Sequence, residues 1–151
     1  MLLSKACVYG LRSSLYVASH ADGSYISIRV LSDNLDISFH FLTKVLQQLT
    51  RAGLMESHKG PNGGIRLTKS GAEMDLFEIV AAIDGIELFT ECAMGLPGCG
   101  VKKPCPLHEK WAGTRDGIRK MLENTNLVAL AKKGKRLNLR ITDDGGFEWT
   151  E

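Results

Sequence analysis

Hydrophobic residues follow helical spacing in the first third of the chain, where short turns separate three helical stretches. These stretches are residues 4–20, 29–35 and 39–52. Ser38 can accept a hydrogen bond from a free backbone amide, so it suits the start of the third helix, and Gly53 suits its end. The pattern therefore predicts three consecutive helices.

After Gly53 the pattern changes to two short strand-like segments, residues 54–58 and 64–67. The residues between them, Lys59-Gly60-Pro61-Asn62-Gly63, are turn formers and suit the tip of a hairpin. Helix, turn, helix and then a basic, Gly-rich hairpin is the order of a winged helix-turn-helix. The expected fold class is therefore mostly α with a small β-wing.

The second half of the chain has further helical patterns. Helices are expected over residues 75–84, 108–124 and 126–132, the last capped by Thr125. The helix over 108–124 carries a narrow apolar stripe on a charged surface, so we expect it to pair with a second helix from another subunit. The stripe consists of Trp111, Ile118, Met121 and Leu122.

The tail alternates like a strand over residues 136–141 and, after a turn, continues through residues 147–149, so a C-terminal hairpin is expected. No internal repeat divides the chain. The pattern gives four segments. They are a winged helix-turn-helix domain at 1–85, a loop at 86–107, the long helix with the following short helix at 108–135, and a tail at 136–151.

The net charge of +2 is unevenly spread along the 151 residues. Residues 1–70 carry eight Lys and Arg against four Asp and Glu, residues 71–100 carry six acids and no base, and residues 101–151 carry eleven bases and seven acids. A basic first segment suits a polyanion partner such as nucleic acid. No apolar run could span a membrane and no signal peptide is recognisable, so we expect a cytoplasmic protein without a membrane partner.

The third helix and the hairpin offer residues suited to binding DNA. A recognition helix presents its first turns to the major groove, where polar side chains bond to bases or phosphates. A cationic hairpin with little side-chain bulk suits a minor groove or a row of phosphates. The candidate DNA-binding residues are Ser38, His40, Thr43, Lys44 and Gln47 on the helix and Lys59, Gly60 and Asn62 on the hairpin. The alternative interpretation of the helix is an ordinary solvated face, and the basic hairpin makes this interpretation less favoured.

Three cysteines and a histidine, Cys92, Cys99, Cys105 and His108, lie together in a Gly- and Pro-rich segment with the spacing C-x6-C-x5-C-x2-H. Cytoplasmic thiols stay reduced, and clustered thiolates with imidazole bind zinc or iron–sulfur clusters. Zinc sites commonly use C-x2-C pairs, so the wider gaps favour an iron–sulfur cluster, with zinc and metal-free cysteines as alternatives. Cys7 lies among apolar residues of the first helix and is expected in the core.

Over residues 1–125 the chain resembles the IscR/NsrR/CymR (Rrf) family of bacterial winged-helix transcription regulators. The resemblance rests on Tyr9, Ile37-Ser38, Phe41-Leu42, residues 49–54, Lys59-Gly60-Pro61-Asn62-Gly63-Gly64, residues 79–85 and the Cys92, Cys99, Cys105 and His108 loop. It implies a homodimer in which the helix after the loop crosses its partner, and a roughly two-fold double-stranded DNA operator. It also implies that a 2Fe-2S or 4Fe-4S iron–sulfur cluster on the three cysteines modulates DNA binding, and of the two we favour 2Fe-2S.

The resemblance also bears on the fourth ligand of such a cluster. In IscR-like members a histidine just after the third cysteine is that ligand, and His108 matches its place. In NsrR-like members it is a carboxylate from the first helix of the other subunit; that position here is Val8, which cannot bind a metal, and neighbouring Cys7 is an outside candidate. Thr43 stands where IscR-like members use a Glu in base selection, and Lys59 replaces the wing Arg, so the operator should differ.

The leading hypothesis is a dimeric transcriptional regulator, repressor or activator, with an iron–sulfur sensor of redox state, nitric oxide or iron–sulfur status. A regulator that switches through thiols or zinc without a cluster is the first alternative. An iron–sulfur electron carrier without DNA binding is the second, and it leaves the Gly-rich hairpin without a use. The sequence contains no credible set of nucleophile, base and acid, so no enzymatic activity is expected.

Overall fold

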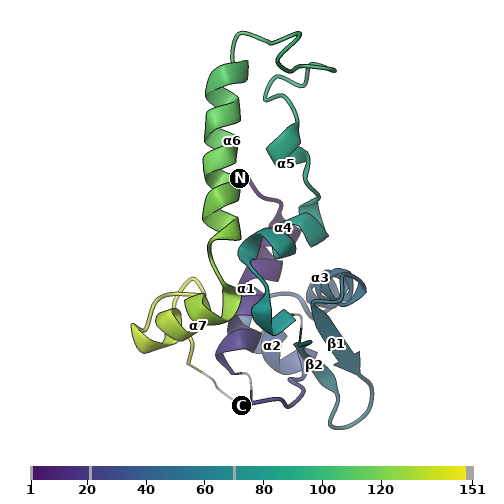
Figure 1. Ribbon diagram of the computed structural model, residues 1–151. Coiled ribbons are helices and arrows are strands. Elements are labelled where there is room, and N and C mark those ends of the chain that lie inside the picture. The colour runs from purple at the N-terminus through teal and green to yellow at the C-terminus, as the bar shows by residue number, and fades with distance from the viewer. Residues whose placement is uncertain (1, 21, 70, 149–151) are drawn as a thin grey trace.

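The computed structural model describes residues 2–20, 22–69 and 71–148, and this part of the chain contains seven α-helices and one two-stranded antiparallel sheet (Figure 1). The helices are α1 (Lys5–Ser19), α2 (Ile28–Leu35), α3 (Phe39–Arg51), α4 (Leu76–Asp84), α5 (Glu87–Thr90), α6 (His108–Glu123) and α7 (Leu127–Arg136), and a 3-10 turn lies at Gly71–Glu73. The strands are β1 (Met55–His58) and β2 (Gly64–Leu67). The predicted order of helices and hairpin is confirmed except for α5, which lies within the segment predicted as a loop. None of the described helices is long and apolar enough to cross a bilayer.

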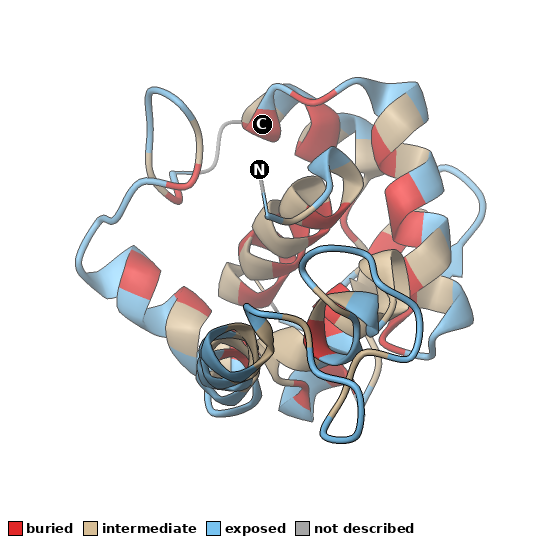
Figure 2. Cartoon of the chain, turned by 90° about the horizontal axis from the view of Figure 1, so that it is seen from above, coloured by how far each residue is buried: buried red, intermediate tan, exposed pale blue. Residues whose placement is uncertain are grey.

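The first three helices surround a common hydrophobic core. α1 begins after Ser4 and α3 after Ser38, and each serine accepts a hydrogen bond from an amide in the first turn, Cys7 N at 3.0 Å and Phe41 N at 3.4 Å. The inner face of α3 consists of the buried residues Leu42, Val45, Leu46 and Leu49. Figure 2 shows such buried positions along the inward faces of the helices. Because each buried leucine contributes about 1.5–3 kcal/mol, the outer face of α3 is firmly oriented.

The hairpin of β1, β2 and the turn between them, called the wing below, is joined to the core by a third segment. The strands pair antiparallel with Met55 opposite Leu67. Ile26 adds a further pairing, since its N–H and carbonyl each bond to Ile65 at 2.8 Å. Gly64 has a φ of +150°, and a Cβ there would clash with the Ile26 carbonyl. The glycine-rich sequence is therefore what lets the wing lie against this segment.

The long helix α6 rises away from the winged domain and carries the cysteine loop at its far end (Figure 1). Its other end is held by a second apolar cluster that joins α1, α4, α5 and α6. The buried members are Cys7, Val80, Phe89 and Leu122. α4 crosses α1 closely because Gly10 has no side chain, and a Cβ there would clash with Ile83. α6 is thus fixed to the winged domain through α1 and α4.

The apolar stripe of α6 serves mainly to seat the helix on its own chain. Ile118 and Leu122 pack in the second apolar cluster, and the indole N–H of Trp111 donates to the carbonyl of Glu91 at 2.9 Å. Met121 remains 60% exposed. A second helix would therefore have to pack on the opposite, exposed face of α6.

α7 is longer than the sequence pattern indicates. It extends to Arg136, and its N-cap is Asn126, whose side chain accepts a hydrogen bond from Ala129 N at 2.9 Å. The predicted cap, Thr125, instead donates its hydroxyl proton to the Met121 carbonyl at 2.6 Å and so belongs to the end of α6. α7 then packs along α1.

The predicted C-terminal hairpin is wrong as far as the chain is described, because residues 137–148 contain no strand. The backbone amides of Leu137 and Leu139 bond to carbonyls of α7 rather than to a neighbouring strand. The predicted turn does form, since Ile141 N donates to the Gly145 carbonyl at 3.0 Å. Alternating leucines without a second strand beside them cannot form a ladder, and Trp149 lies outside the described residues.

Candidate metal centre and candidate nucleic-acid groove

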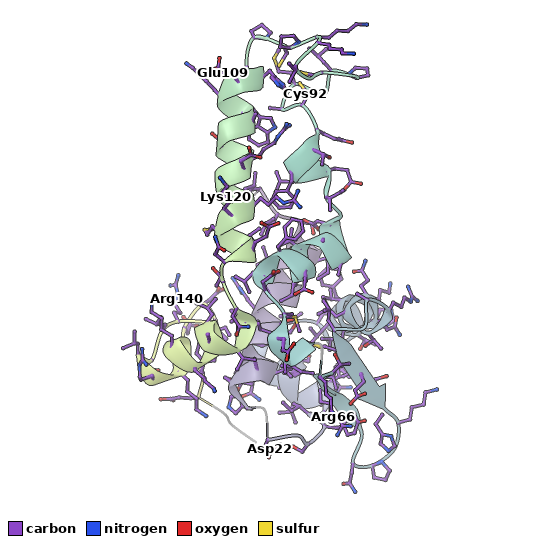
Figure 3. All side chains as sticks on the ribbon, viewed as in Figure 1. Asp22, Arg66, Cys92, Glu109, Lys120 and Arg140 are labelled. Atoms are coloured by element: carbon purple, nitrogen blue, oxygen red, sulfur yellow. The ribbon has the colours of Figure 1, made fainter. Side chains whose placement is uncertain are left out.

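The three cysteines between α5 and α6 converge at the far end of α6. Their Sγ atoms all lie within 4.8 Å of one another, and those of Cys92 and Cys105 are 3.5 Å apart. The start, the middle and the end of the loop each supply one half-buried thiol, with Cys99 in the middle. Figure 3 shows the labelled Cys92 at the end of α6 that carries Glu109. The structure therefore brings together the three cysteines that the spacing singled out.

Two glycines give the loop the shape that this convergence needs. Gly95 and Gly98 have φ values of +69° and +70°, a region that other residues adopt only with strain. Gly95 N donates to the Cys92 carbonyl at 3.0 Å, and Cys99 N donates to the Leu96 carbonyl at 3.3 Å. The chain thus reverses direction twice between the first and second cysteine.

Backbone amides point at the sulfur atoms. Met94 N donates to Cys92 Sγ at 3.4 Å, and Cys105 N donates to Cys99 Sγ at 3.3 Å. The amides of Leu96 and Met94 are the main cause that lowers the pKa of Cys92 to about 7. For Cys99 the Cys105 amide acts in the same direction, but burial and the neighbouring sulfur atoms outweigh it and raise the pKa. The loop thus stabilises a thiolate, the form that binds metal, at Cys92.

His108, the predicted fourth ligand, is the first residue of α6 and lies next to the thiols. Its Nδ1 atom is 3.5 Å from Cys99 Sγ. The set of mutually close ligand atoms consists of the three thiols, so His108 touches one edge of the set rather than its centre.

Cys7 is not part of this site. It is fully buried between α1, α4 and α5, where burial, and then the nearby Asp84 carboxylate, raise the pKa of its thiol to about 12. The interpretation of Cys7 as a core residue is confirmed. Cys7 is also the outside candidate for the fourth ligand, but it lies away from the cysteine loop of its own chain.

A pair of side chains on α6 fixes the start of the cysteine loop. The Glu91 carbonyl, one residue before Cys92, accepts hydrogen bonds from Trp111 Nε1 at 2.9 Å and from Arg115 Nη1 at 3.0 Å. Sequence reasoning assigned Trp111 to helix pairing and missed this role. The available signal was a Trp and an Arg four residues apart, which places both on the same face of the helix.

The donor set suits more than one metal centre. A tetrahedral zinc ion with bonds of about 2.3 Å to sulfur places its thiolates roughly 3.8 Å apart, close to the 3.5 Å between Cys92 and Cys105. An iron–sulfur cluster divides its thiolates between irons and suits a somewhat wider set. Three clustered cysteines beside an imidazole can therefore bind a metal ion or an iron–sulfur cluster.

A groove of about 610 Å³ lies between the outer face of α3, the wing and the start of α2. Of the predicted DNA-binding residues, four line it: Thr43, Gln47, Lys59 and Gly60. The others lie outside its lining: Ser38, His40, Lys44 and Asn62. Ser38 acts as the N-cap of α3, and all four are exposed.

The groove also contains cations that sequence reasoning missed. Arg29, in the first turn of α2, lies with its guanidinium 4.2 Å from the centre of the Phe39 ring, and Arg51 lines the groove from the last turn of α3. No ion pair involves Arg29, Arg51 or Lys59 among the described residues. The signal for Arg29 was its place at the start of the first helix of the helix-turn-helix, which crosses the DNA backbone in such motifs.

The model of a protein family, Rrf2, described as an iron-dependent transcriptional regulator, matches residues 3–133. This range includes the groove, the cysteine loop, α6 and most of α7. Both candidate sites therefore lie within the matched range.

Solved structures with the same arrangement of elements include CymR of B. subtilis, described as its global cysteine regulator, at 24% identity over 87% of this chain and 96% of that one, with a TM-score of 0.73. CymR of Staphylococcus aureus is similar at 26% identity, over 85% and 97% of the two chains, with a TM-score of 0.67. IscR of T. potens is similar at 18% identity, over 91% of each chain, with a TM-score of 0.69. These likenesses establish a shared winged-helix fold.

Proposed function

Because the chain belongs to the Rrf2 family of DNA-binding transcriptional regulators, which are not enzymes, we propose that a metal centre in its cysteine loop sets its affinity for an operator. The observation that carries the proposal is the convergence of three thiols at the end of α6. The iron-dependent description of the family favours iron as the metal, and three converging thiols are ligands that iron–sulfur clusters use.

In this proposal the groove between α3 and the wing receives a strand of the operator backbone. Thr43 and Gln47 carry a hydroxyl and an amide that suit base edges, and Arg29 and Lys59 suit the phosphates on either side. The remaining proposed contacts are Ser38, His40, Lys44, Gly60 and Asn62. Their exposure supports this assignment, as do the groove's cations Arg29, Arg51 and Lys59, which form no ion pair with the described residues.

We assign the centre to a 2Fe-2S cluster held by Cys92, Cys99, Cys105 and His108. When bound, such a cluster supplies redox-active iron that responds to oxidants, nitric oxide or iron supply. His108 opens α6, so its imidazole would tie the helix to the loop. The 3.5 Å between its Nδ1 and Cys99 Sγ supports this role.

Packed side chains connect the cysteine loop to the recognition helix. Ile118 and Leu122 of α6 pack with Cys7 of α1 and Val80 of α4, and both α1 and α4 pack on α3. A displacement of α6 is therefore carried by a packed interior rather than by a flexible linker. Regulation then requires that the loaded and empty proteins differ in DNA affinity.

We also propose a homodimer formed through the exposed face of α6. Gly113, Gly117 and Met121 follow one another at four-residue intervals there, and among the described residues no atom outside the helix's own backbone lies within 4 Å of a Cβ added at either glycine. An exposed glycine inside a helix costs roughly 1 kcal/mol relative to alanine, so two of them favour a close-packed partner helix. Leucine at both glycine positions should shift the protein from dimer to monomer in sedimentation, whereas alanine at both should leave it dimeric.

A single zinc ion is the second candidate for the centre, and the 3.5 Å between Cys92 and Cys105 Sγ favours it. Zinc would make the protein a thiol-based regulator without a chromophore. The electron-carrier alternative does not fit a family of DNA-binding regulators.

Anaerobic purification followed by iron, sulfide and zinc analysis tests the assignment. We expect a coloured protein with iron and sulfide, and Cys92→Ala, Cys99→Ala and Cys105→Ala should each abolish the colour while Cys7→Ala retains it. A colourless protein with one zinc per chain would overturn the cluster and support the second candidate. A protein that binds neither metal would overturn the metal centre itself.

A further inference from the structure

The outer side of α7 and the start of the tail form a basic surface that the proposed function does not use. Between Glu123 and Asp143 the chain has five basic residues and no acid. They are Lys132, Lys133, Lys135, Arg136 and Arg140, and all are exposed. α7 lies on the opposite side of α1 from α3 and the wing (Figure 1). DNA bound in the groove would therefore leave this surface uncovered.

The tail that forms part of this surface packs against α7 and α1. A Cβ at Gly134 would clash with the ring of Phe147, which is buried against α7 at this position. The Tyr16 hydroxyl of α1 donates to the Glu148 carbonyl at 3.0 Å, and Ile141 is buried as well. The tail is thus anchored on its inner side, and its outer side keeps a defined shape.

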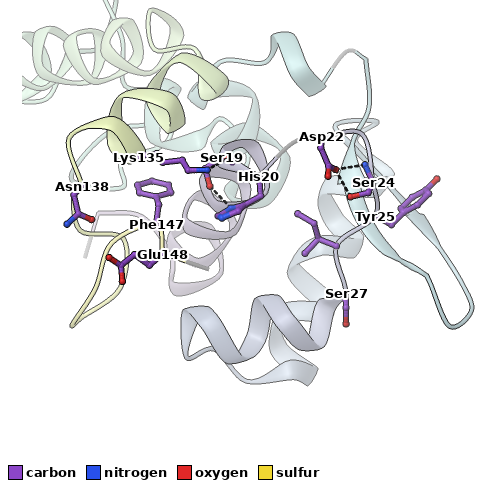
Figure 4. A pocket seen from close by; sticks show the side chains of 11 residues that line it. Ser19, His20, Asp22, Ser24, Tyr25, Ser27, Lys135, Asn138, Phe147 and Glu148 are labelled. Carbon is purple, nitrogen blue, oxygen red and sulfur yellow. Dashed lines mark hydrogen bonds between the residues drawn. The ribbon is translucent and has the colours of Figure 1, made fainter. Parts of the chain in front are cut away.

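The basic side chains of this surface differ in whether they already interact with other groups of the chain. Lys135 lines a hollow of about 980 Å³ between the end of α1, residues 22–27 and the tail (Figure 4), and its Nζ donates to the Ser19 carbonyl at 3.4 Å. No ion pair in the described ranges involves Lys132, Lys133 or Arg136. These three positions fall on the face of α7 opposite its buried residues, so their charges face outward together.

Arg140 lines a hollow together with Asp144 and Glu148, so acids of the tail lie near it although no ion pair among the described residues involves it. Asp143 lies 4.0 Å from Arg12 on α1. The acids of the tail therefore lie beside Arg140 and Arg12, and the excess positive charge is centred on the outer face of α7.

Two exposed leucines adjoin these cations. Leu137 is 52% exposed and follows Lys133 by one helical turn, and Leu139 is 44% exposed. Phosphate backbones offer little apolar surface for such leucines, whereas a peptide that mixes acidic and apolar residues matches both features. We propose that Lys132, Lys133, Arg136, Leu137 and Leu139, called the α7 surface, bind an acidic, apolar peptide segment of a partner protein.

Fluorescence anisotropy with a labelled peptide of interspersed Asp, Glu, Leu and Phe tests this proposal. We expect saturable binding that Lys133→Ala with Arg136→Ala weakens by about tenfold, since charge pairs and apolar contacts both contribute to such interfaces. Leu137→Ser with Leu139→Ser should weaken it to a similar degree. Unchanged circular dichroism shows that each variant is folded.

A matched pair on the other side of the molecule separates this proposal from the proposed function. Lys44→Ala with Lys59→Ala removes the same charge and should leave peptide binding unchanged while lowering DNA affinity. The proposal is overturned if the mixed peptide does not bind, if the α7 variants bind it like the wild type, or if a glutamate-only peptide of equal charge binds as tightly. Competition between the peptide and duplex DNA would also contradict it.

Discussion

The groove and the cysteine loop are held in place in opposite ways. The groove is formed by α3, whose inner residues are buried, and by a wing that pairs with Ile26. Residues 91–107 contain no buried side chain, and Val101 among them is 93% exposed. The recognition surface is therefore preformed by the core, whereas the loop depends on thiols, glycines and a few hydrogen bonds. This difference suits the proposed function, because segments that rearrange in regulation come from the less stable parts of a fold.

Loss of one loop cysteine should have the largest effect and should be confined to the loop. Cys105→Ala removes one of three thiols, and we expect it to abolish metal retention, measured as metal per chain after gel filtration. Thermal unfolding of the winged domain should change little. Cys7→Ala is the matched control, because that thiol packs in the core and its loss should leave the metal content intact. Equal metal loss in both variants would contradict the separation of the two regions.

A substitution in the core should lower the stability of the protein and leave its metal content unchanged, the opposite of the loop substitution. Leu42→Ala removes a fully buried side chain beneath the groove, and we expect it to lower the free energy of unfolding by about 2–5 kcal/mol in a denaturant titration. Below the transition the metal content per folded chain should match the wild type. A variant that unfolds normally but loses its metal would show that the loop shares the stability of the core.

Replacement of the groove's cations should affect DNA binding alone. Arg29→Ala and Lys59→Ala should each weaken operator binding several-fold and reduce the salt dependence by about one ion per removed phosphate contact. Lys69→Ala, an exposed cation outside the groove lining, is the control and should leave both quantities unchanged. Affinity measured at several salt concentrations checks this, and an unchanged slope in Arg29→Ala would remove that residue from the interface.

The smallest expected effect concerns the anchor of the cysteine loop. Trp111→Phe keeps an aromatic side chain but removes the indole N–H that donates to the Glu91 carbonyl, a hydrogen bond worth about 0.5–1.5 kcal/mol. We expect faster loss of metal to a chelator, with global stability nearly unchanged. If the rate of loss equals that of the wild type, the bond does not hold the loop.

The winged fold was predictable because its determinants are local. The leucines of α3 repeat at helical spacing, and the Gly-rich wing sequence is required by the close approach of Gly64 to Ile26. The thiol triad was predictable for the same reason, since its members are close in sequence.

Contacts between distant segments were not predictable. The Glu91 carbonyl takes its partners from α6, and Arg29 reaches the groove only because α2, α3 and the wing fold together. The hairpin predicted for the tail does not form in the described part of the chain, because alternating apolar and polar residues specify a strand only when a second strand is available. The backbone amides of Leu137 and Leu139 instead donate to carbonyls of α7.

The most direct test measures operator affinity on one anaerobic preparation before and after its metal is removed by a chelator. The fragment is one that the wild-type protein itself recovers from genomic DNA, and salt is held constant. We predict that the two affinities differ by about tenfold or more, which corresponds to roughly 1.4 kcal/mol of coupling, and that Cys105→Ala shows the affinity of the metal-free form. Equal affinities with and without metal would contradict the account, because the cysteine loop would then have no influence on the groove.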